Sequence, residues 1–151
     1  MERPDFVHLH LHSEYSLSDG IIRIKDLVSR ASSLHYSAVG LTDLTNLFGL
    51  LEFYRSSREK GIKPIVGAEV NVIKDKDSLP APIVLLVKDK QGYINLTKIV
   101  SKAYVDGQVN GEPMVELSLL QNYSEGLIAL SGGMEGHVGQ SILAGNIPLT
   151  E

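Results

Sequence analysis

The sequence contains no cysteine among its 151 residues. Disulfide bonds, iron–sulfur clusters, thiolate zinc sites and a cysteine nucleophile are therefore excluded. Basic residues are not in excess either, because 14 Lys and Arg stand against 18 Asp and Glu, which gives a net charge of −4. A domain that binds nucleic acid by itself usually has a basic footprint. The charge balance therefore does not favour direct nucleic-acid binding by this chain.

Long apolar segments are also missing. No run is long and apolar enough to span a membrane. The start, "MERPDFVHLH", lacks the basic, apolar and small-residue regions of a signal peptide. We therefore expect a cytoplasmic chain with no membrane partner. What is present, 151 residues with 43% hydrophobic content, suits one compact globular domain.

Two common signatures of nucleotide binding and hydrolysis are absent as well. The segment "SGG" at 131–133 lacks the lysine and the spacing of a P-loop, and it falls short of the dinucleotide fingerprint. The serine-rich stretches contain no G-x-S-x-G nucleophile elbow. We interpret "SGG" as a tight strand-to-helix turn and His137 as a surface or capping residue.

Hydrophobic periodicity predicts alternating strands and helices. Apolar residues recur at helical spacing in 22–34, whereas short apolar runs such as 63–73 indicate strands. The predicted strands are 6–10, 37–43, 63–73, 83–89 and 126–133, and the predicted helices are 22–34, 46–61, 92–105, 114–123 and 136–145. The order β-α-β-α-β-β-α-α-β-α indicates an α/β fold with a mainly parallel sheet.

Polar residues with ligand chemistry lie on these strands or at their ends. His10 and His12 end the first strand, Asp43 ends the second, and Glu69 lies in the third. Active residues of α/β folds collect at the carboxyl ends of strands. These side chains therefore form a candidate site.

The histidines His8, His10 and His12 stand at alternate positions, and Asp19 follows seven residues later. A strand alternates its faces with period two, so the three imidazoles are expected on one side, with neighbours about 6–7 Å apart. Together with Asp19 and Glu69, such a set suits Zn²⁺, Mn²⁺ or Fe, and clusters of these ions activate water for phosphoester hydrolysis. The alternatives are hydrogen-bonded core histidines and, for Asp43, helix capping or hydrogen bonding to a ligand.

Four stretches together resemble a known family. They are "FVHLHLHSEYSLSDG", "AVGLTDLTNLFGLLEFYRSSREKGIKPIVGAEVNV", "GYINLTKIVSKAY" and "EGLIALSGG". They are similar to the start of proteobacterial replicative DNA polymerase III α subunits, the PHP (polymerase and histidinol phosphatase) domain. The resemblance implies a distorted (β/α)₇ barrel, of which residues 1–151 cover only the N-terminal part. It also implies that the polymerase palm, fingers and thumb, with their Mg²⁺, lie downstream and are absent from this chain.

The resemblance also carries a metal-ligand pattern onto this sequence. The family's paired histidines fall on His10 and His12, and its first aspartate and its glutamate fall on Asp19 and Glu69. His8 precedes the pair and is assigned to the strand. The family's second motif usually reads T-D-H-G-N, but here it reads "TDLTN", so Leu44 stands at a ligand position. The next family histidine would fall near Pro82, where none exists.

A site that has lost these two ligand positions is expected to be degenerate. The resemblance then implies a catalytically inactive scaffold within the parent polymerase, which is a DNA-directed nucleotidyltransferase. Its expected partners are the proofreading exonuclease subunit and the rest of the α subunit, with DNA only through the parent protein. No cofactor is firmly expected beyond residual Zn or Mn.

Two alternatives stay open at this point. One is an active metal-dependent phosphoesterase, either a 3′–5′ exonuclease or a pyrophosphatase, which depends on His10, His12, Asp19 and Glu69. The other is a small PHP phosphatase that functions alone, which the match to polymerase-type segments disfavours.

Overall fold

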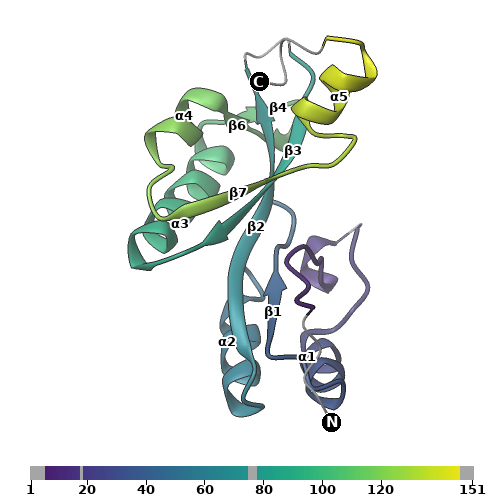
Figure 1. Cartoon of the computed structure of the whole chain (residues 1–151). Coiled ribbons are helices and arrows are strands. Elements are labelled where there is room, and N and C mark those ends of the chain that lie inside the picture. Colours follow the sequence, from purple (N-terminus) through teal and green to yellow (C-terminus); the bar gives the residue numbers. More distant parts are fainter. Residues whose placement is uncertain (1–5, 18, 75–77, 147–151) are drawn as a thin grey trace. The chain divides into compact units, whose positions relative to one another are not determined.

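The computed structural model describes residues 6–17, 19–74 and 78–146 (Figure 1). The chain divides into two compact units, residues 1–68 and residues 69–151. Strand β2 (Lys63–Ile73) begins in the first unit and ends in the second.

The first unit contains the short 3₁₀ helix η1 (Glu14–Ser16), helix α1 (Ile24–Ser33), strand β1 (Ala38–Leu41) and helix α2 (Leu50–Glu59). Helix α1 forms because apolar residues recur on one face, and all four of them are buried. Asp26 in its first turn and Arg30 in its last turn also suit the helix dipole. The predicted helices 22–34 and 46–61 are thus confirmed, with shorter bounds.

Strand β1 pairs in parallel with the first half of β2, from Ala38 opposite Lys63 to Leu41 opposite Val66. All four residues of β1 are buried. The core of this unit joins α1, β1 and α2 and consists of Ile24, Leu27, Val28, Ala31, Val39, Leu41, Phe53 and Ile62. Leu11 and Tyr15 pack against it, so the core also holds the histidine segment, residues 8–13.

The histidine segment is not a regular strand, contrary to the prediction for 6–10. It follows β1 in the same direction through two backbone hydrogen bonds. Gly40 N–H donates to His8 O (2.7 Å) and Thr42 N–H donates to Leu11 O (2.9 Å). The segment therefore advances three residues, from His8 to Leu11, while its partner advances two, from Gly40 to Thr42. This mismatch breaks the period-two alternation, and His8 does not share the surroundings of His10 and His12.

The second unit contains the rest of β2, strand β3 (Ala81–Val87), helix α3 (Lys90–Val105), the two-residue strands β4 (Gln108–Val109), β5 (Glu112–Pro113) and β6 (Val115–Glu116), helix α4 (Leu117–Asn122), strand β7 (Leu127–Ser131) and helix α5 (His137–Leu143). Asp89 caps α3 by accepting a hydrogen bond from Gly92 N–H (2.9 Å). The core includes Val70, Val72, Val84, Leu85, Leu96, Ile99 and Val115.

The α/β fold is confirmed, and the sheet contains both parallel and antiparallel pairs. Its five strands follow the order β1-β2-β3-β7, with β6 also paired to β2. The β2–β6 pair is parallel, whereas β3 and β7 are antiparallel from Ile83 opposite Ser131 to Val87 opposite Leu127. The segment 108–113, between two predicted helices, forms the β4–β5 hairpin. Its turn is at Asn110 and Gly111, which both have positive φ.

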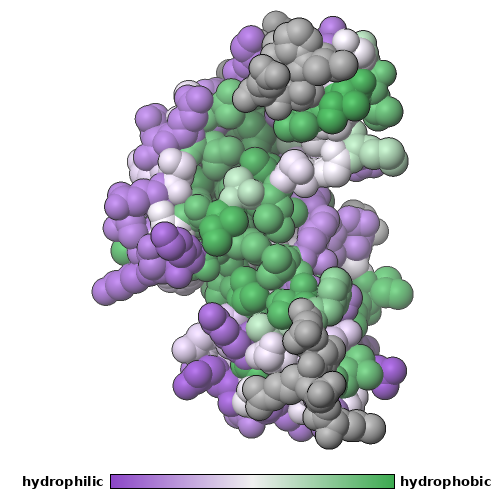
Figure 2. Space-filling model, in the orientation of Figure 1, coloured by the Kyte–Doolittle hydropathy of each residue, from purple (hydrophilic) through white to green (hydrophobic). Residues whose placement is uncertain are grey.

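The second unit exposes apolar side chains on its last elements. Figure 2 shows apolar surface over β7 and around α5. Ile128 on β7 is 48% exposed, and Leu143 at the end of α5 is 73% exposed. None of the helices in the described part of the chain has the length and apolar character needed to cross a membrane.

Replacing Gly40 by alanine is expected to displace the histidine segment. An added Cβ would lie 2.9 Å from Leu9 O and 3.1 Å from His8 O, both backbone atoms that cannot rotate away. We expect a loss of about 1–3 kcal/mol in the free energy of unfolding, measured in urea. Amide NMR shifts of residues 8–11 should change as well.

The control for this substitution is Gly61→Ala. Gly61 has φ +70°, so alanine there also costs stability through backbone strain. Its added Cβ would have no other atom within 4 Å. Equal shifts of residues 8–11 in both variants would contradict the close approach of Gly40 to the segment.

Candidate metal centre

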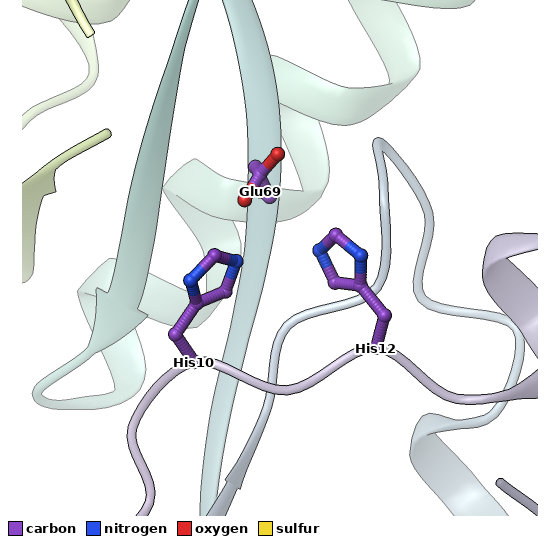
Figure 3. Close-up of side chains that lie close together, drawn as sticks. All are labelled: His10, His12 and Glu69. Carbon is purple, nitrogen blue, oxygen red and sulfur yellow. The ribbon is translucent and has the colours of Figure 1, made fainter. Parts of the chain in front are cut away.

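Three side chains with metal-ligand chemistry gather at one place. One ligand atom each of His10, His12 and Glu69 lies within 4.8 Å of the others (Figure 3). The two imidazole rings are 5.1 Å apart and inclined by 77°. Glu69 lies in the middle of strand β2 (Lys63–Ile73). Two imidazoles and a carboxylate are a donor set that suits Zn²⁺ or Mn²⁺, so these residues fit one such ion.

Asp19 is not a member of this group of three. Its Oδ2 lies 2.8 Å from Nδ1 of His12, and the Asp19 side chain is 66% exposed while that of His12 is only 12% exposed. A carboxylate bound to one imidazole nitrogen fixes the ring orientation and directs the other nitrogen elsewhere. Asp19 thus contacts His12 directly, and the predicted role of both residues as metal ligands stays a prediction.

His8 lies in different surroundings. Its ring packs edge-on against Phe6 (4.7 Å) and Tyr36 (5.5 Å), and its Nε2 is 3.5 Å from the Tyr36 hydroxyl. His8 is therefore an aromatic packing residue of the segment.

Asp43 anchors the residues that follow the histidines. It is 2% exposed, and its carboxylate accepts hydrogen bonds from Ser13 N–H (2.6 Å), from Ser13 Oγ (2.8 Å) and from Ser16 Oγ (2.8 Å). The two hydroxyls also accept: Ser13 Oγ from Tyr15 N–H (3.2 Å) and Ser16 Oγ from Leu44 N–H (3.0 Å). Asp43 does not cap α2, whose N-cap is Gly49. It fixes the backbone directly after His12.

Two neighbours of Asp43 hold the same segment. Thr42 Oγ1 accepts a hydrogen bond from Leu11 N–H (2.8 Å), and Asn46 Nδ2 donates to Tyr15 O (2.9 Å). Sequence reasoning missed Thr42 and Asn46, and it also missed Ser13 and Ser16. Their signal in the sequence is the density of small polar residues in "SEYS" and "TDLTN", a composition that is also typical of loops and helix caps.

The two lost ligand positions have structural contacts of their own. Leu44 is half-buried, its N–H donates to Ser16 Oγ, and its carbonyl accepts from Asn46 Nδ2 (3.0 Å). Pro82 in β3 lies against Gly132, where an added Cβ would overlap the Pro82 carbonyl oxygen. Neither side chain has an atom that binds a metal.

Replacing Asp43 by asparagine is expected to destabilise the first unit. An amide turns an NH₂ toward groups that donate hydrogen bonds, and it removes charge-assisted bonds from a buried site. We expect a loss of about 2–4 kcal/mol in the free energy of unfolding, measured in urea. Asp26→Asn is the matched control, because Asp26 is exposed on α1. Equal stability of the two variants would rule out the anchoring role.

Comparison with known proteins supplies the family. The PHP domain model matches residues 8–151. The chain is 44% identical over its whole length to the DNA polymerase III subunit alpha of Escherichia coli strain K12. It is 41% identical over 97% of its length to that of Vibrio cholerae. The similarity is to the N-terminal region of these subunits, and the chain spans 13% of the length of each.

Solved structures agree at the level of fold. A putative metal-dependent phosphoesterase from Bifidobacterium adolescentis superposes with a TM-score of 0.52 at 22% identity, over 68% of this chain and 34% of that one. An amidohydrolase from Chromobacterium violaceum superposes with a TM-score of 0.51 at 27% identity, over 64% and 32%. With the family model matched over residues 8–151, this chain belongs to the PHP domain family.

Proposed function

We propose that this chain is the N-terminal PHP segment of a DNA polymerase III α subunit and serves as a structural scaffold of a cytoplasmic replicative polymerase. The observation that carries the proposal is identity of 41–44% to α subunits over 97–100% of the chain. The polymerase palm, fingers and thumb would then follow in the parent protein.

Loss of catalysis follows from the two substituted ligand positions. Even residues that only orient a ligand typically contribute about 10–100-fold to metal affinity or activity. Replacement of a ligand by Leu44 and of another by Pro82 removes donor atoms altogether. The network around Asp43 remains, and it supports the backbone without any ion.

We expect the full-length protein to lack metal-dependent phosphoesterase activity. Supplied with Zn²⁺ or Mn²⁺, it should hydrolyse a chromogenic phosphodiester no faster than its His12→Ala variant. The control is His137→Ala, which alters an exposed histidine on α5. Turnover that disappears with His12→Ala but survives His137→Ala would favour an active phosphoesterase. The observation that supports this alternative is the cluster of His10, His12 and Glu69.

The scaffold role includes docking of the proofreading exonuclease subunit. A lysine-reactive cross-linker applied to the full-length α subunit with that partner should join it to exposed lysines of this chain, such as Lys25, Lys60 and Lys98. The free α subunit supplies the control for links within one chain. Cross-links confined to regions after residue 151 would contradict docking on this domain.

A further inference from the structure

One end of the first unit carries four exposed cationic side chains, which we name the basic end: Arg30, Arg58, Lys60 and Lys63. We propose that the basic end contacts the phosphate backbone of the DNA on which the parent polymerase acts. The inference rests on the proposed function for the identity of the nucleic acid, whereas the surface itself follows from the structure.

The fold brings the basic end together from two connections. Residues 34–37 join α1 to β1, and residues 60–62 join α2 to β2. The two connections end side by side, because Ala38 pairs with Lys63 and Lys63 N–H donates to Ser37 O (2.9 Å). The helices that precede them, α1 and α2, also contact each other. The last turns of both helices therefore lie near the start of the β1–β2 pair.

The charge at this end is opposite in sign to that of the whole chain. Residues 30–37 and 58–63 contain four Lys and Arg and one acidic residue, Glu59, whereas the chain has a net charge of −4. Asp26 and Glu52 lie in the first turns of α1 and α2, at the opposite ends of these helices. Within the described part of the chain, none of the four cations takes part in an ion pair. Their positive charge is therefore available to attract an anion.

The helix dipole accounts for only part of this pattern. A cation in the last turn of a helix is stabilised there, which suffices to explain Arg30 and Arg58. Lys63 begins a strand and has no helix end to complement. His35 adds an exposed imidazole at this end, from a position with φ 58° where glycine is the favoured residue, as Gly61 is after α2 (φ 70°). These features favour an anionic partner outside the chain.

The chemistry of the basic end favours nucleic acid over an acidic protein. Protein interfaces depend on a central group of apolar and aromatic side chains that leave water. Residues 30–37 and 58–63 are all described by the structure, and Leu34, at 39%, is their only exposed large apolar side chain. Phosphate contacts need no such group, because the release of counterions by Lys and Arg supplies the affinity. The surface therefore suits a phosphate backbone, which it would bind without reading base sequence.

The test is the salt dependence of primer–template DNA binding by the full-length protein, measured by fluorescence anisotropy. The variant is Lys60→Gln combined with Lys63→Gln, which removes two exposed charges outside the helices. If both lysines contact phosphates, the slope of log K against log salt concentration should become shallower by about 2. The affinity should also fall equally for primer–templates of different sequence, because phosphate contacts carry no sequence information.

The matched control is Arg23→Gln combined with Lys25→Gln, which removes the same charge at the start of α1. Its slope should equal that of the wild type. The conservative pair Lys60→Arg and Lys63→Arg should also keep the wild-type slope, because it keeps both charges. Circular dichroism of each variant confirms that the fold is retained.

Three results would overturn the proposal. A wild-type slope in the variant that lacks Lys60 and Lys63 would show that the basic end contacts no DNA, and it would leave the proposed function intact. An equal loss of slope in the control that lacks Arg23 and Lys25 would show an effect of net charge rather than of this surface. A full-length protein that binds no primer–template at all would overturn the proposed function as well.

Discussion

The buried carboxylate of Asp43 is the constraint on which the N-terminal half of this structure depends. A carboxylate out of water is costly unless its oxygens accept hydrogen bonds. Here Ser13 and Ser16 supply one backbone and two hydroxyl donors, all 27 to 30 residues distant in sequence. The loop after the histidines is therefore tied to the end of β1. Removal of the Asp43 carboxylate, or of the serine groups that donate to it, would leave buried polar groups without hydrogen bonds.

This constraint separates two roles within the segment "TDLTN". Thr42, Asp43 and Asn46 hold the histidine segment and its loop through their side chains. Leu44 contributes through its backbone N–H and carbonyl, which any residue except proline provides. The hydrogen bonds made at position 44 therefore do not depend on its side chain, whereas those made by its neighbours do.

The sequence predicted several elements well because burial repeats along them. Helix α1 shows this, with Ile24, Leu27, Val28 and Ala31 all buried. The prediction failed where a second segment decides the outcome. Gly40 lies close to His8 and Leu9, and the histidine segment does not alternate regularly there. No pattern within residues 6–10 predicts this close approach. The antiparallel β3–β7 pair is likewise invisible to element order.

Part of the predicted candidate site comes together in the structure, whereas its role in metal binding stays a prediction. His10, His12 and Glu69 meet as the strand-end argument suggested, although that argument assumed a regular first strand. Asp19 contacts His12 because Gly20 closes the loop onto Ser13, a backbone contact that spacing does not encode. The partners of Asp43 were missed because small polar residues near a helix start are usually caps.

The side chains of His10, His12 and Glu69 meet only part of what metal-dependent hydrolysis requires. Hydrolysis needs an ion with open positions, a water activated on it and a second group that stabilises the leaving oxygen. Two imidazoles and one carboxylate supply the first requirement only. Leucine at position 44 and proline at position 82 add no donor for the second ion of a clustered site.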